Sequence, residues 1–146
     1  MSFPMQSGAT AAPSIQSGTW LVVARIMMSL VFIHSGFGKI VGFAAFSDFL
    51  SRSGVPWSPL FAAGAVLTEL GVGACLAIGF RTRWAAWALA AFTVAATVIG
   101  HPFWAGGPAA DGHLLQALKN ASIFGGLLAI ALAQGAFDAE RRTPGP

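Results

Sequence analysis

Three polar side chains at the start of the last apolar stretch of the sequence are the first candidates for chemistry. Gln116, Lys119 and Asn120 are spaced by three and four residues, which places them on one face of a helix. The stretch that follows, 121–133, contains no charged residue. A lysine and amides carried into so apolar a segment are costly unless they face protein or trapped water. The spacing therefore predicts hydrogen-bond donors gathered inside the molecule.

A second set of polar residues consists of ionisable side chains that lie within other apolar stretches. If these stretches cross a membrane as helices that rise about 1.5 Å per residue, Glu69 lies at a depth in the membrane between those of Lys119 and Arg25. We expect Glu69 to pair with Lys119, with Arg25, or with both. Such a charge network is more consistent with holding helices in register than with direct chemistry, and no catalytic residue is assigned.

Lys39 and His101 are expected at the boundary of the same half of the molecule as the first cluster. An apolar pocket with a few converging donors is the usual form of a small-ligand site. The same cluster would also serve to hold helices together without a ligand. The hypothetical ligand-binding residues are Lys39, His101, Gln116, Lys119 and Asn120.

Other polar residues give weaker patterns. His101 and His113 have no cysteine partner near them, so no metal site is predicted. Thr93 and Thr97 are expected to bond to the helix backbone rather than to a ligand. Cys75 is the single cysteine, which excludes an internal disulfide. It lies in an apolar stretch and is expected to pack as a small apolar residue.

The composition of the chain indicates which class of protein holds these side chains. Apolar residues make up 55% of the 146 residues and charged residues only 9%, whereas soluble domains carry about 25% charged residues. The chain is therefore expected to be an integral membrane protein in contact with the lipid bilayer. Its net charge of +3 comes from scattered residues rather than from a basic stripe, so nucleic acid is not an expected partner.

Four apolar stretches are each close to the length of about 20 residues that crosses a bilayer. They cover roughly 20–38, 60–80, 84–100 and 114–135. Backbone polar groups in lipid must be satisfied within the segment, which favours helices. The predicted fold class is all-α, an integral membrane four-helix bundle.

The connection between the first two spans has an amphipathic pattern. Apolar residues recur there at helical spacing, with polar residues on the opposite side. This pattern predicts a short helix lying at the membrane interface. The apolar side comprises Phe43, Phe46, Phe49 and Leu50, and the polar side Ser47, Asp48, Ser51 and Arg52.

The two ends of the chain are expected to lie on the same side of the membrane. Residues 1–19 are read as a flexible N-terminal tail and 138–146 as a C-terminal tail. Lysine and arginine are enriched on the cytoplasmic side of membrane proteins. The side holding both ends and the turn between the second and third spans is the more basic, so both termini are expected in the cytoplasm. It carries Arg81, Arg83, Arg141 and Arg142, against Lys39 and Arg52 on the other side.

Short motifs recur in order along the four predicted spans. The first span reads R-x6-F-x3-G-x2-K from Arg25 to Lys39, and the second carries T-E-L-G-V-G at 68–73. G-F-R-T-R-W-A-A at 79–86, H-P-F-W at 101–104 and L-K-N-A at 118–121 follow. In this order and spacing the chain resembles the DoxX family of small bacterial four-helix membrane proteins. The resemblance covers a DoxX-like transmembrane domain at 20–137.

The resemblance implies a function that the residues alone do not. The DoxX family is named for similarity to a subunit of an archaeal thiosulfate:quinone oxidoreductase, and some relatives are tied to oxidative stress. It thus implies a redox-associated, quinone-linked, multi-pass subunit of the bacterial inner (plasma) membrane, with quinone as the possible cofactor. The alternative is a non-enzymatic scaffold that docks a partner redox or stress-response enzyme. The family has no generally agreed catalytic residues, so whether the chain is an enzyme stays open, as does its oligomeric state.

Overall fold

The computed structural model describes residues 15–141, and within that range the chain is helical without strands. Four segments are long and apolar enough to cross a membrane. The predicted all-α four-helix membrane bundle is therefore confirmed. The elements are α1 (Ile15–Val41), α2 (Phe43–Arg52), α3 (Ser58–Leu67), η1 (Thr68–Val72), α4 (Gly73–Ile78), α5 (Thr82–Gly100), η2 (Phe103–Ala105) and α6 (Ala110–Glu140).

The observed helices extend beyond the predicted spans at both ends of the chain. α1 already includes Ile15–Thr19, the last part of the predicted N-terminal tail. α6 continues to Glu140, past the predicted boundary at residue 137. The rest of the two predicted tails, 1–14 and 142–146, lies outside the described residues.

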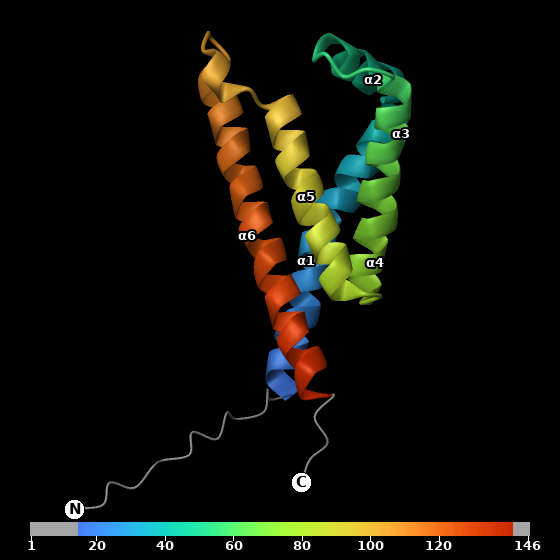
Figure 1. Cartoon of the computed structure of the whole chain (residues 1–146), viewed down its shortest axis with the longest axis vertical. Coiled ribbons are helices and arrows are strands. Elements are labelled where there is room, and N and C mark those ends of the chain that lie inside the picture. The colour runs from blue at the N-terminus through green and yellow to red at the C-terminus, as the bar shows by residue number, and fades with distance from the viewer. Residues whose placement is uncertain (1–14, 142–146) are drawn as a thin grey trace, which may run out of the picture.

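The helices converge at one end of the molecule and diverge at the other, as Figure 1 shows. The narrow end holds the start of α1, the turn between α4 and α5, and the end of α6. The wide end holds α2, η2 and the start of α6. α6 packs along α5, while α1 packs on α3, η1 and α4 and also contacts α6. The bundle therefore has two arms, α3 with α2 and α5 with α6, that separate toward the wide end.

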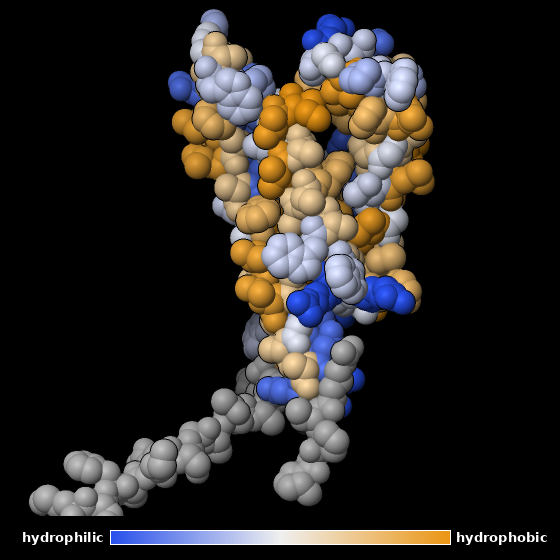
Figure 2. Space-filling view, in the orientation of Figure 1, coloured by the Kyte–Doolittle hydropathy of each residue, from blue (hydrophilic) through white to orange (hydrophobic). Residues whose placement is uncertain are grey.

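The packed core lies in the narrow half, where the arms meet. Leu76, Leu89 and Leu127 are completely buried there, with Cys75 packed beside them as expected. Alanines along the start of α5 allow the neighbouring helices to approach closely. Large apolar side chains cover much of the outside (Figure 2). This pattern fits a molecule whose surface faces lipid.

The predicted amphipathic helix is present as α2, but one residue that was expected on its polar side is buried. Leu50 is buried, as the apolar pattern requires. Ser47, which was assigned to the polar side, is also buried and lies 3.3 Å from the hydroxyl of Ser58. The reason is that α2 folds back on the start of α3, so a small hydroxyl fills the contact between the two helices.

Candidate functional site

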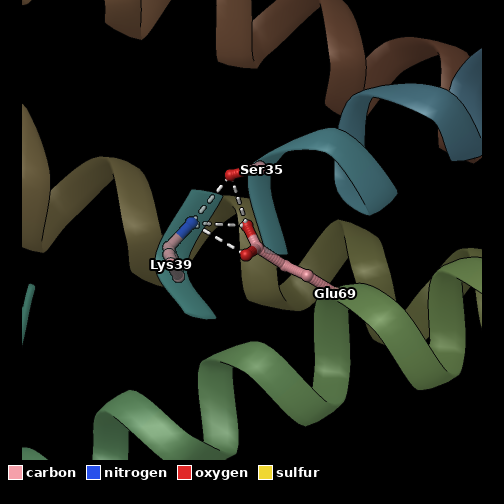
Figure 3. A network of polar contacts seen from close by, with 3 residues as sticks. All are labelled: Ser35, Lys39 and Glu69. Atoms are coloured by element: carbon pink, nitrogen blue, oxygen red, sulfur yellow. Dashed lines mark hydrogen bonds and ion pairs between the residues drawn. The ribbon is translucent and has the colours of Figure 1, made fainter. Parts of the chain in front are cut away.

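Glu69 lies at the centre of a closed set of polar contacts between α1 and the second span. Nζ of Lys39 is 2.8 Å from Oε2 and 2.9 Å from Oε1 of Glu69. The same Nζ donates to Oγ of Ser35 at 2.7 Å, and that hydroxyl donates to Oε1 of Glu69 at 3.0 Å. Figure 3 shows the three side chains pointing toward one another. The carboxylate is thus satisfied entirely by α1.

The backbone that carries Glu69 is not a regular α-helix. Thr68–Val72 forms a π-helical segment in the middle of the span. Such single π turns are rare and are often found at functional sites. Gly36 of α1 lies directly against this segment, because a Cβ there would be 3.0 Å from Cβ of Glu69. The close approach brings Ser35 and Lys39, on the same helix, within reach of the carboxylate.

The partner of Glu69 differs from both bases that the sequence suggested. The structure pairs it with Lys39, and neither Lys119 nor Arg25 contacts it. Lys39 was expected at the membrane boundary because its backbone lies there. Side chains of a helix point back toward its N-terminus, so the lysine runs down α1 toward Ser35 and the carboxylate. The predicted network of Arg25, Glu69 and Lys119 is therefore not formed.

The two bases left out of that pair lie in different places. Arg25 is near the narrow end, where its Nη1 is 3.4 Å from Oγ1 of Thr82. Lys119 is exposed and lines a shallow, apolar groove between α1 and α6. The difference arises because α6 packs chiefly on α5 and not on the second span that carries Glu69. A long side chain in such a groove can carry its ammonium group toward the membrane surface.

A cavity of about 1160 Å³ separates the two arms at the wide end. The hollow between the two lobes is visible in Figure 2. Apolar side chains of α2, α3 and α5 form most of its wall, including Phe46, Phe49, Phe61 and Phe92. Lys39 lies in the wall as well, and its ammonium group is 5.1 Å from the centre of the Phe46 ring. We call this space the wide-end cavity.

The cavity contains three of the five predicted ligand-binding residues, with different capacities to donate. Lys39, His101 and Gln116 all line it. The ammonium group of Lys39 already has three acceptors, so it supplies charge rather than a free donor. Within 15–141, no hydrogen bond is found for the side chains of His101 and Gln116. With the hydroxyl of Thr68, they are polar groups of the wall that have no hydrogen bond to the described chain, and His113 lies beside them with its ring centre 5.9 Å from that of His101.

The other two predicted residues do not line the cavity. Nδ2 of Asn120 donates to Oγ1 of Thr97 at 2.9 Å, which ties α6 to α5. Thr97 and Thr93 both donate to backbone carbonyls one turn earlier, as expected. Asn120 thus helps to hold the α5–α6 arm together, and Lys119 lies in its separate groove.

Sequence reasoning missed Ser35, His113 and the π turn. A signal for Ser35 was available, because it precedes Lys39 by one helical turn and therefore shares its face. His113 was considered only as part of a metal pair. Within the described residues no cluster of three or more metal-binding side chains occurs. No sequence pattern marks Thr68–Val72 as π-helical.

Comparisons with known proteins agree with the fold. The sequence model of the DoxX family matches residues 20–102. The inner membrane protein YphA of Escherichia coli strain K12 is 35% identical over 124 residues, which is 84% of this chain and 89% of YphA. The inner membrane protein YqjF of the same organism is 36% identical over 124 residues, 83% of this chain and 89% of YqjF. No solved structure matches the chain.

Proposed function

The chain belongs to the DoxX family, and on that premise we propose that it is an inner-membrane subunit that binds a quinone or a similar flat ring in the wide-end cavity. The name of each relative places that relative in the inner membrane. The four apolar spans of this chain suit the same location. The redox link itself rests on the family resemblance together with the shape and lining of this cavity.

The observation that carries the proposal is the combination of an apolar wall with a few polar groups at one end. Small-ligand pockets commonly occupy about 300–1,000 Å³ and are lined chiefly by apolar and aromatic residues. The wide-end cavity reaches about 1160 Å³ and has four phenylalanines in its wall. A quinone supplies two carbonyl oxygens that accept electrons and protons. The uncommitted side chains of His101 and Gln116 are placed to donate to such an oxygen.

The ion pair of Lys39 and Glu69 has a supporting role in this proposal. Its ammonium group lies in the cavity wall with 20% of the side chain exposed, while the Glu69 side chain is only 5% exposed. A positive charge fixed beside an apolar ring favours any state of the ring that gains negative charge. Glu69 holds that charge in position and would not itself touch the ligand.

Removing the donors should weaken quinone binding. We expect Gln116→Leu and His101→Phe each to raise the Kd for a short-tail quinone about two- to tenfold, the equivalent of one hydrogen bond. Gly64→Leu should abolish binding, because Gly64 lines the cavity and a Cβ there meets no atom within 4 Å. The added side chain would occupy the ligand space without disturbing the fold. Titration of the protein in mild detergent, after assay of bound quinone, measures both effects.

The matched control is Lys119→Met, which changes a polar residue of the same helix outside the cavity. It should leave the Kd within about twofold of the wild-type value, since a surface change away from the site has little effect. Absence of both bound quinone and saturable binding would reject the quinone proposal. The remaining function would then be a membrane scaffold that docks a partner redox enzyme.

We also propose that the narrow end faces the cytoplasm. Arg81, Arg83 and Arg141 lie at that end of the described chain. At the wide end Lys39 is held inside the bundle by Glu69, which leaves Arg52 and the exposed Lys119 as the basic residues nearest that surface. The charge bias therefore still favours the narrow end. A basic excess on one side supports a cytoplasmic assignment for it.

Cysteine labelling tests this orientation. In a Cys75→Ala background, a cysteine at Ala109 should react with a membrane-impermeant maleimide added to intact cells. A cysteine at Arg81 should react only after the membrane is permeabilised. Both positions are exposed in the structure, so differences in labelling report the side of the membrane rather than burial. The reverse pattern would place the narrow end outside.

A further inference from the structure

A second cavity lies at the narrow end and has a different chemical character. It measures about 440 Å³ and lies between the turn that joins α4 to α5 and the last turns of α6. Its wall carries two arginines and an amide together with one carboxylate, and it has no aliphatic side chain larger than alanine. The polar lining residues are Arg81, Thr82, Arg83, Gln134 and Asp138. We call this space the narrow-end cavity.

The arginines of the narrow-end cavity have no acidic partner among the residues that the structure describes. Within residues 15–141 no carboxylate lies within 4.0 Å of the guanidinium of Arg81 or Arg83. Asp138 is engaged by Gln134, whose Nε2 donates to Oδ1 at 3.0 Å. The guanidinium of Arg83 lies along Gly135, where a Cβ would be 3.6 Å from its Cζ. The cavity lining thus carries two arginines against one carboxylate, a positive excess that no ion pair within the described residues neutralises.

A third guanidinium lies immediately behind the cavity wall. Arg25 of α1 is in contact with Gly79, which lines the cavity. Its Nη1 reaches Oγ1 of Thr82 at 3.4 Å, and its Nε is buried without a hydrogen-bond partner in the described chain. A buried cationic group without a counter-charge is unfavourable. An anion in the narrow-end cavity would reduce this cost.

The start of α5 adds further donors at the same place. Arg81 adopts a left-handed backbone conformation with φ 45°, and no side chain caps the helix. The first amide groups of a helix have no acceptor within it. Here those amides belong to Thr82 and Arg83, both in the cavity wall. Arginine side chains and free amide groups together form a lining that suits the oxygens of a phosphate group.

We propose that the narrow-end cavity binds the phosphate of an anionic phospholipid headgroup. Its position favours a lipid over a phosphate from solution, because Trp84 and Phe80 lie exposed beside it. Aromatic side chains gather at the level of the lipid headgroups. Basic pockets between the ends of membrane helices are suited to anionic headgroups. This inference does not depend on any ligand in the wide-end cavity, which lies at the other end of the molecule.

Lipid binding to the delipidated full chain in detergent tests the proposal. Short-chain phosphatidylglycerol should bind at least about tenfold more tightly than phosphatidylcholine of the same chain length, as measured by native mass spectrometry and by thermal shift. Arg81→Gln and Arg83→Gln should each weaken phosphatidylglycerol binding about fivefold. Asp138→Asn should strengthen it, because a negative charge leaves the wall. A variant that was merely misfolded could not bind more tightly.

Arg52→Gln is the matched control, since it removes the same charge from an exposed position at the wide end. It should leave phosphatidylglycerol binding unchanged. Equal binding of the two lipids, or an equal loss in Arg52→Gln and Arg83→Gln, would overturn the proposal. Sodium phosphate that stabilises the protein as strongly as phosphatidylglycerol would identify free phosphate as the ligand and overturn the lipid assignment.

Discussion

Replacing Lys39 by methionine should lower the free energy of unfolding by about 3–5 kcal/mol, because it leaves Glu69 buried without a counter-charge. The Glu69 side chain is only 5% exposed and receives both of its charged contacts from Lys39. After the substitution Ser35 would be its single remaining donor. Equilibrium unfolding of the purified protein in detergent measures the loss.

Replacing Glu69 by glutamine should lower the free energy of unfolding by less than replacing Lys39 by methionine. Glu69→Gln leaves Lys39 with Ser35 and the Phe46 ring as partners, and 20% of its side chain is already exposed in the wide-end cavity. Its ammonium group therefore retains access to solvent that Glu69 lacks. The double variant Lys39→Met/Glu69→Gln should be closer to wild type than Lys39→Met alone, since no buried charge is left unpaired. We thus expect strong coupling between the two sites.

Two double variants serve as controls for this coupling. Lys119→Met and Arg25→Gln should each add to the effect of Glu69→Gln without coupling, because neither base contacts Glu69. Additive losses for Lys39 and Glu69 would contradict the observed ion pair. Coupling between Glu69 and Lys119 instead would support the pairing that helical depth alone suggested.

Most of the fold could be predicted because lipid imposes strong constraints on sequence. A helix that crosses the bilayer needs about 20 apolar residues, and four such stretches separated by polar turns are visible in the chain. The short connection at Arg81–Arg83 likewise favours second and third spans that are antiparallel neighbours. The pattern of Phe43, Phe46 and Leu50 was sufficient to predict α2. These features depend on the residues within each stretch and only slightly on which helices pack against one another.

The candidate site was harder to predict because it depends on contacts between helices. Depth along an ideal helix placed Lys119 near Glu69, but α6 packs on α5 instead of on the span that carries Glu69. The direction of the Lys39 side chain, back along α1, moved that lysine from the boundary into the bundle. The separation of the two arms, which opens the wide-end cavity, follows from the position of the packed core in the narrow half.

Gly36 marks a place where the backbone of α1 closely approaches the π-helical segment. A Cβ at Gly36 would be 2.9 Å from Cγ of Leu70 and 3.0 Å from Cβ of Glu69. Cβ of Glu69 is fixed to the backbone and cannot turn away, so α1 would have to move outward. We expect Gly36→Ala to lower the free energy of unfolding by about 1–3 kcal/mol, the usual cost of overpacking. The same movement would lengthen the contacts that Ser35 and Lys39 make with Glu69.

Gly38→Ala is the matched control, two positions along the same helix. A Cβ at Gly38 meets no atom within 4 Å, so the added methyl group should stabilise the protein by up to about 1 kcal/mol through helix propensity. Unfolding in detergent should thus give changes of opposite sign for one and the same substitution. Equal effects at both positions would mean that helix propensity alone governs them and that α1 does not approach Glu69 closely. A loss confined to Gly36→Ala would identify this glycine as the residue that lets Lys39 reach its carboxylate.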